Sequence, residues 1–546
     1  MAFTIMFKGG KYVTSESPMS GRSAAAELGV PIEEVAAWRV NNYARPLEWV
    51  VDGDAEAELI TTRSDEGLQI YRRSLDFAFS IVCSRFLGRR AVLRHSIDGG
   101  HYWEFDDGDA SQSDAYRIHA GMSEMVRHDI PIIRKVLPVD AAQRVFTKQG
   151  EREIAELFVR ASMDPVEVYR CGTVYGYFCG PLVPSTGMLR HFDVIKFSHG
   201  LILQSPTEAC PDGVPPFRGD VSLGEVFLDF ARWLDTLGLK YLSSLHRIVA
   251  DGKSQELILI SEAFHSQRLS RIADEITARP GVKVVTVSGP SSAGKTTFSE
   301  RLKIQLIVCG KHPVTLPMDN YYRERVDAPR DENGEYDFET PDALDLGLLR
   351  DNLSRILAGE EVVTPRYDFK MGRKVPGKAI KLGSSDILIM EGIHGLNDQV
   401  LAMLPDESRL SVFVSPLTGI CIDPHNRTST SDNRLLRRIV RDYRTRAKSA
   451  TDTLISYPKV LQGARLYVFP YQNRADMMFN SALPYELGVL KGYAEPILHT
   501  VPHDSPAFGE ATRLLNILRF VPSIQSDGVP NNSVIREFIG GSCLDV

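Results

Sequence analysis

One segment of the sequence combines glycines, a lysine and threonines in a spacing that binds phosphate. Residues 289–296 match the pattern GxxxxGK[ST], directly after an expected strand and directly before a helix-forming run at 298–307. Glycines let backbone N–H groups turn toward phosphates, and a helix N-terminus adds partial positive charge. The pattern predicts a site for ATP, and the alternative is a chance Gly-rich turn.

The chemistry of this loop assigns a role to each side chain that carries a polar group. We expect Lys295 to reach the β- and γ-phosphates and Thr296 to offer its hydroxyl to Mg²⁺. The residues that we expect to hold the nucleotide are Gly289, Ser291, Ser292, Ala293, Gly294, Lys295, Thr296 and Thr297.

Two acidic residues stand where expected strands end. Asp319 follows the strand-like run 314–316, so it should lie at the carboxyl end of a strand and could take the proton of an attacking hydroxyl. Glu391 ends the apolar run 387–390, which predicts an acid beside the phosphate loop that binds Mg²⁺. The alternatives are an Asp that caps a turn and a chance acidic residue at a strand end.

Arginines are concentrated in residues 433–446, on an expected helix that runs into a mobile segment. Arginines in a closing lid can neutralise the charge of the transferred phosphoryl group and exclude water. Arg438, Arg441 and Arg446 are therefore catalytic candidates together with Lys295 and Asp319. A solvated charged face is the alternative for each arginine.

The hydrophobic pattern predicts the strands and helices that position these residues. The short β-rich runs 284–287, 314–316, 387–390, 411–414 and 477–479 alternate with helical segments, which predicts an α/β domain with a parallel sheet flanked by helices. The polar helix-like stretch 261–279 precedes it and ends at Pro280, so we expect it to be a connector.

The remaining chain divides into further segments. Residues 1–62 predict a small α/β module and residues 63–260 a second α+β domain, followed by the α/β domain at 265–500 and a C-terminal extension at 501–546.

Composition limits where the protein works. A net charge of -7 gives no general attraction to nucleic acid or anionic membrane, and no run of 18 apolar residues occurs. The seven cysteines are scattered without a CxxC pair, which argues against a disulfide framework. We expect a cytoplasmic protein without a membrane partner.

Taken together, the motifs resemble the uridine kinase and phosphoribulokinase family of P-loop kinases over roughly residues 281–500. The matching segments are 289–296, 318–322, 336–343, 365–369, 390–392 and 434–442. The resemblance implies that Asp319 is the catalytic base and lies near Mg²⁺, with Thr296 and Glu391 as the other metal-binding residues. It places Asp319, Tyr322, Asp342, Tyr367 and Arg434 at the acceptor and residues 438–446 in the lid.

The N-terminal half is similar to the TGS module and the editing-type domain of threonyl-tRNA synthetase, at residues 40–47, 65–72 and 178–184. Where that family has the metal-binding HxxxH pair, this chain has Arg73 and Phe77, and Leu182 replaces the last histidine. Cys179 alone remains, and one thiolate does not complete a tetrahedral zinc site. We therefore predict no metal and no ester hydrolysis here, and instead a binding role toward RNA or a regulatory ligand.

The leading hypothesis is transfer of the γ-phosphate of ATP to the 5′-hydroxyl of a nucleoside, uridine or cytidine, by a homo-oligomer. A second enzyme hypothesis is a kinase of another small hydroxyl metabolite such as a sugar phosphate. It is favoured because the histidine expected to touch the base is missing after residue 369, and the basic run Arg366, Lys370, Arg373, Lys374 and Lys378 stands there. A third is an ATP-gated RNA- or ribosome-associated binding protein.

Overall fold

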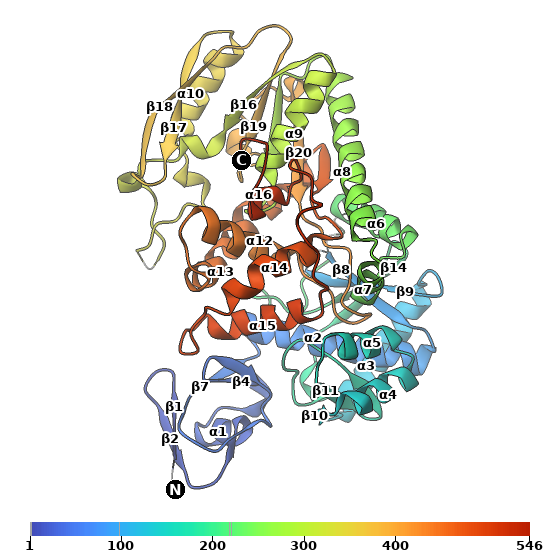
Figure 1. The fold of residues 1–546 in the computed structure, drawn as a ribbon. Helices are drawn as coiled ribbons and strands as arrows, with labels where there is room; N and C mark the ends of the chain where they lie inside the picture. The colour runs from blue at the N-terminus through green and yellow to red at the C-terminus, as the bar shows by residue number, and fades with distance from the viewer. Residues whose placement is uncertain (1–2, 98, 218, 220, 333) are drawn as a thin grey trace. The chain divides into compact units, whose positions relative to one another are not determined.

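The structure, a computed structural model, describes residues 3–97, 99–217, 219, 221–332 and 334–546 (Figure 1). The chain forms two compact units. Unit 1 contains Met1–Asp251, Gly419–Thr428 and Glu495–Ser523, and unit 2 contains Gly252–Thr418, Ser429–Ala494 and Ile524–Val546. The units therefore do not follow the four consecutive segments expected from the sequence, because the chain returns to each of them.

The centre of unit 2 is a five-stranded sheet in the order β16-β19-β15-β20-β21, and every neighbouring pair is parallel. Its strands are β15 (Val284–Ser288), β16 (His312–Pro317), β19 (Asp386–Glu391), β20 (Arg409–Ser415) and β21 (Met477–Asn480). All five residues of β15 are buried, as expected for a central strand covered on both faces. The predicted parallel sheet is confirmed.

Helices cover this sheet. On one face, α8 (Ser254–Thr277) and α9 (Lys295–Val308) bury Leu269, Ile276 and Leu302 in one cluster with β15. On the other, α10 (Leu346–Leu357) packs in a cluster that includes Leu316 and Leu388. The prediction that residues 261–279 form a connector is wrong, because apolar residues at helical spacing bury α8 in the core.

Unit 2 contains further elements besides this sheet and its covering helices. They are the antiparallel hairpin β17 (Val362–Asp368) and β18 (Arg373–Ile380), and the helices α11 (Asp398–Leu401), α12 (Thr430–Thr445), α13 (Ala450–Tyr467), α14 (Glu486–Leu498) and α16 (Arg536–Ile539). Ser429 caps α12 by accepting a hydrogen bond from the backbone N–H of Asp432, which fixes where this arginine-rich helix begins.

Unit 1 begins with a small α/β module. A five-stranded sheet in the order β2-β1-β7-β4-β5 packs against α1 (Gly21–Glu27) around the fully buried Trp38. The strands are β1 (Phe3–Phe7), β2 (Tyr12–Ser15), β4 (Val35–Val40), β5 (Tyr43–Arg45) and β7 (Ala55–Thr61), with β3 (Met19–Ser20) and β6 (Val50–Val51) paired separately.

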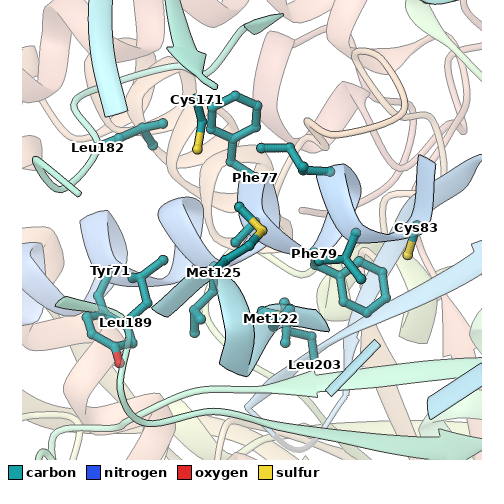
Figure 2. Packing of buried hydrophobic residues seen from close by; sticks show 14 of the residues in the cluster. Tyr71, Phe77, Phe79, Cys83, Met122, Met125, Cys171, Leu182, Leu189 and Leu203 are labelled. Atoms are coloured by element: carbon teal, nitrogen blue, oxygen red, sulfur yellow. The ribbon is translucent and has the colours of Figure 1, made fainter. Parts of the chain in front are cut away.

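The rest of unit 1 is built on the buried helix α2 (Asp65–Val82), whose apolar side chains form the core in Figure 2. A four-stranded antiparallel sheet has the order β13-β14-β9-β8, and a three-stranded sheet has the order β10-β11-β12. The strands are β8 (Ala91–Ile97), β9 (Gly100–Phe105), β10 (Ile132–Leu137), β11 (Val166–Cys171), β12 (Val174–Gly176), β13 (Asp193–Phe197) and β14 (Gly200–Gln204). The helices are α3 (Gln112–His128), α4 (Val139–Gln149), α5 (Arg152–Arg160), α6 (Val221–Thr236), α7 (Leu242–Ala250) and α15 (Phe508–Arg519).

Within the described part of the chain, every helix is too short or too polar to cross a lipid bilayer.

Candidate active site

The phosphate loop runs from the end of β15 at Ser288 to the start of α9 at Lys295. Gly289 has a φ of 153°, and a Cβ there would lie 2.0 Å from the carbonyl oxygen of Val414, so the turn requires glycine. Lys295 is buried and its Nζ donates to the carbonyl oxygen of Pro290 at 3.3 Å. The loop lysine thus folds back over its own loop, as a residue that cradles phosphate must.

Glu391 lies next to this lysine. β19 pairs with β15 in parallel and aligns Glu391 with Val287, so the carboxylate emerges beside the start of the loop. Its Oε1 is 3.9 Å from the Nζ of Lys295. Burial raises the pKa of Glu391 to about 7, and the positive charge of Lys295 opposes that shift.

Asp319 approaches the same place from the neighbouring strand. β16 aligns Pro317 with Glu391, and Asp319 follows in a 3-10 turn at Met318–Tyr321. Its side chain is open to solvent, yet the surrounding protein desolvates it enough to raise its pKa, while Lys295 and Arg446 lower it. The structure therefore brings Asp319, Lys295 and Glu391 together.

The oxygen atoms of this group suit Mg²⁺. The hydroxyl of Thr296 hydrogen bonds with Glu391, and the Asp319 carboxylate is near enough to raise the pKa of Glu391 further. Mg²⁺ takes one or two carboxylates and completes its shell with water and substrate phosphates. The residues present therefore fit the ion that the sequence predicts here.

Two arginines of helix α12 donate hydrogen bonds to the phosphate loop. Arg434 Nε donates to the carbonyl oxygen of Ser291 at 2.9 Å, and Arg438 Nη1 donates to the hydroxyl of the same serine at 3.0 Å. The two other nitrogens of the Arg434 guanidinium are buried without a hydrogen-bond partner among the described residues. Buried unpaired cationic donors beside a phosphate loop are suited to an anionic ligand.

The other predicted lid arginines are gathered by one buried acid. Asp442 is fully buried and forms ion pairs with Arg438 at 3.3 Å, Arg441 at 2.7 Å and Arg446 at 3.7 Å. Arg441 and Arg446 are also close enough to Asp319 to lower its pKa. Two of the three predicted arginines therefore lie near the predicted base, and all three are held by an acid that the sequence analysis did not single out.

Arg437 is a further residue that the sequence analysis missed. Its side chain is fully buried, donates to the carbonyl oxygen of Ser481 at 2.8 Å and forms an ion pair with Glu486. It also donates to the loop carbonyl of Ala293 at 3.4 Å. An arginine in a charged run looks solvated from the sequence, and no local signal separates Arg437 from its neighbours.

The residues that the sequence predicts at the acceptor include two tyrosines that pack together. The rings of Tyr322 and Tyr367 lie 5.9 Å apart, and the Tyr322 hydroxyl donates to the carbonyl oxygen of Phe338 at 3.3 Å. Burial raises the pKa of Tyr322, and the carboxylates of Asp319 and Glu339 raise it further. Tyr322 therefore lies near Asp319 and Glu339, and Tyr367 packs against Tyr322.

Asp342, which the resemblance places at the acceptor, is not brought to this group. Its side chain is exposed, and its backbone carbonyl accepts from Arg323. Glu339 lies there instead. Burial raises the pKa of Glu339, and Arg438, Arg434 and Lys295 lower it, so its carboxylate stands among the cationic groups of the site. The signal in the sequence was its place in the same motif, three residues before Asp342.

The degenerate metal motif of unit 1 is built into a hydrophobic core. Phe77 and Leu182 both belong to the cluster in Figure 2, and the Phe77 ring lies 5.3 Å from that of Phe178. Arg73 donates to the backbone carbonyl of Cys179 at 3.1 Å. Burial raises the pKa of the Cys179 thiol to about 11, which keeps it protonated and makes it a poor ligand.

A parallel sheet, a phosphate loop and acids at two neighbouring strand ends define a P-loop kinase domain in unit 2. Residues 284–485 match the model of the Phosphoribulokinase / Uridine kinase family. A solved structure described as a possible uridine kinase from Bacillus stearothermophilus is 18% identical, covering 39% of this chain and 98% of its own, with a TM-score of 0.28.

The N-terminal region matches a different group. A threonine--tRNA ligase of Thermotoga petrophila is 26% identical over 203 residues, 36% of this chain and 31% of the relative. The threonine--tRNA ligase of Rhodospirillum rubrum is 32% identical over 178 residues, 32% of this chain and 28% of the relative. The chain thus spans less than a third of the length of these curated relatives.

Proposed function

We propose that the protein transfers the γ-phosphate of ATP to the 5′-hydroxyl of a nucleoside, uridine or cytidine. The observation that carries this proposal is the convergence of Lys295, Asp319 and Glu391, with a tyrosine-lined acceptor side next to them. A nucleotide-dependent switch needs the phosphate loop and a magnesium ligand, but it does not need a base facing an acceptor pocket.

In the proposed reaction, Asp319 accepts the proton of the acceptor hydroxyl as its oxygen attacks the γ-phosphorus. The new oxygen–phosphorus bond forms as the bond between the γ-phosphorus and the β,γ-bridging oxygen breaks, and ADP leaves. Lys295 and the arginines gathered by Asp442 stabilise the charge on the transferred group. Bound Mg²⁺, held by Thr296, Glu391 and Asp319, would neutralise the phosphate charge.

The acceptor side also contains groups suited to the sugar. Tyr322 and Tyr367 offer ring faces for stacking, and the Glu339 carboxylate can accept hydrogen bonds from ribose hydroxyls. These contacts would orient the 5′-hydroxyl toward Asp319, and holding two reactants in line accounts for a large share of the catalysis of phosphoryl transfer.

One observation favours a second candidate, a kinase of an anionic acceptor such as a sugar phosphate. Arg366, Lys370 and Arg373 are exposed on the β17–β18 hairpin, the same hairpin that supplies Tyr367. Exposed cations beside an acceptor pocket would attract a phosphorylated acceptor more strongly than a neutral nucleoside.

One assay separates the two candidates. The purified protein is incubated with ATP, Mg²⁺ and a panel of nucleosides and sugar phosphates, and ADP and phosphorylated products are measured. Product from uridine or cytidine supports the first candidate, and product from a sugar phosphate alone supports the second. ATP hydrolysis that no acceptor changes would contradict both.

For the N-terminal half we propose a regulatory binding role rather than nucleic-acid binding. Residues 1–62 contain nine acidic and five basic residues, which disfavours contact with a polyanion. We further propose that the protein works in the cytoplasm as a homo-oligomer. Size-exclusion chromatography with light scattering tests the oligomeric state.

A further inference from the structure

The C-terminal segment Ile524–Val546 is part of unit 2, and its short helix α16 contacts the start of α9, next to the phosphate loop. Glu537 Oε2 accepts hydrogen bonds from the hydroxyl of Thr297 at 2.8 Å and from its backbone N–H at 3.3 Å. Thr297 is fully buried. A carboxylate of the chain itself therefore occupies the start of helix α9.

The hydrogen-bond donors that Glu537 occupies are of the kind that bind nucleotide phosphates at a phosphate loop. The first intrahelical hydrogen bond of α9 runs from the N–H of Phe298 to the oxygen of Gly294, so the N–H of Thr297 has no partner within the helix. Such N–H groups at the N-terminus of a helix bind anionic oxygen. The carboxylate of Glu537 stands in for an oxygen of a nucleotide phosphate.

A second contact between the C-terminal segment and the loop involves Val534 and Gly294. Gly294 has a φ of 84°, and a Cβ built on it would lie 2.4 Å from Cγ2 of Val534. The buried Val534 therefore packs directly against the backbone of the glycine that precedes the loop lysine. Val534 thus contacts Gly294, just before Lys295, and Glu537 contacts Thr297, just after it.

The arginine helix holds this segment in place. Arg444 donates to the carbonyl oxygens of Glu537 and Phe538, each at 3.1 Å, and the Arg437 guanidinium lies 5.0 Å from the Phe538 ring centre. Since α12 also supplies Arg438 to the loop, the position of the segment is tied to the position of the arginines that face the transferred phosphate.

The charge at this place opposes nucleotide entry. The carboxylates of Glu391 and Asp319 already stand near the loop, and Glu537 is close enough to act electrostatically on Glu391. A triphosphate that enters beside a third carboxylate meets like-charge repulsion in a partly buried space, where screening is weak.

We propose that residues 533–540 form an autoinhibitory segment, in which Glu537 occupies the place of a nucleotide phosphate on Thr297. Nucleotide binding then requires this segment to leave the loop, and any ligand or partner that displaces it activates the enzyme. The inference rests on the proposed binding of ATP by the phosphate loop, but it does not depend on which acceptor is phosphorylated.

The test measures nucleotide binding by the full-length protein without any acceptor. Isothermal titration calorimetry with the β,γ-imido analogue of ATP and Mg²⁺ compares wild type with Glu537→Gln, which keeps the side-chain shape and removes the charge. We expect the Kd of Glu537→Gln to be about tenfold lower. The matched control is Asp527→Asn, which removes an exposed carboxylate from the C-terminal segment Ile524–Val546 but outside residues 533–540, and which should leave the Kd unchanged.

Hydrogen exchange provides a second measurement that does not depend on a variant. Saturating wild type with the analogue should increase exchange at the backbone amides of residues 533–540. An unchanged or higher Kd in Glu537→Gln would overturn the proposal, because the carboxylate then does not oppose nucleotide binding. A segment that stays protected at saturation would also overturn it, because the nucleotide then binds without displacing residues 533–540. Absence of analogue binding in both wild type and Glu537→Gln would overturn the autoinhibition and the proposed ATP binding together, whereas a failed acceptor panel alone would not.

Discussion

The ammonium group of Lys295, at the start of helix α9, lies 3.9 Å from a carboxylate oxygen of Glu391, at the end of strand β19. The parallel register of β15 and β19 sets this distance, since it aligns Val287 with Glu391. β16 adds Asp319 from the other side of β19. Three consecutive strands of the sheet order thus supply one cation and two acids to one site.

Substitutions of Lys295 and Asp319 should affect nucleotide binding and phosphoryl transfer differently. We expect Lys295→Ala to lower kcat/KM roughly 100- to 1,000-fold and to weaken nucleotide binding, because the ammonium is a fixed donor to the phosphates. Asp319→Asn should keep nucleotide binding and lose a similar factor in kcat, since the amide cannot take the proton. Steady-state kinetics and calorimetry check this, and wild-type turnover in Asp319→Asn would make the base assignment wrong.

Glu339 and Asp342 give a test of which acid binds the proposed acceptor. Glu339 stands among Arg438, Arg434 and Lys295, whereas the Asp342 side chain is exposed. Glu339→Gln should raise the KM for the acceptor about tenfold, because a charge-assisted hydrogen bond to a sugar hydroxyl becomes a neutral one. We expect Asp342→Asn to change it much less. The KM for the acceptor is measured with ATP saturating. A larger increase in Asp342→Asn than in Glu339→Gln would support the role of Asp342 that the family resemblance implies.

The phosphate loop and the two strand-end acids were predictable because their signals are local. A glycine pattern between a strand and a helix, or an acid that ends an apolar run, determines its own place in a parallel sheet. Glu537 has no such signal: it reaches Thr297 across 240 positions of the chain through tertiary packing alone. Arg437 was missed for a related reason, since a buried arginine and a solvated one look the same within a charged run.

The ion pair between Arg437 and Glu486 should be important for the stability of unit 2. Both side chains are almost completely buried, and Asn433 also donates to Glu486. Glu486→Gln would leave a buried guanidinium without its counter-charge, which costs roughly 3–5 kcal/mol of unfolding free energy. Urea denaturation measures this loss. The control is Glu360→Gln, which breaks the exposed pair with Arg355, and an equal shift in both variants would contradict the expectation.

His265 should make unit 2 sensitive to acid. It lies in α8, almost fully buried, with its Nε2 3.1 Å from the carbonyl oxygen of Ala482, to which the neutral ring donates. Burial, together with the charge of Arg301, lowers its pKa from 6.5 to about 3. Above pH 6.5 the ring is neutral in both the folded and the unfolded state, so the contribution to stability is complete there.

As the pH falls below 6.5, the unfolded chain binds a proton at His265 that the folded chain excludes, and the free energy of unfolding decreases until the pH reaches about 3. Between pH 7 and pH 5 this residue should cost wild type about 2 kcal/mol. His265→Gln keeps a donor for the Ala482 carbonyl but does not titrate, so its urea midpoint should fall less over the same interval. The exposed His312→Gln should behave as wild type, and parallel pH profiles for wild type and His265→Gln would show that protonation of this histidine is not what destabilises the unit.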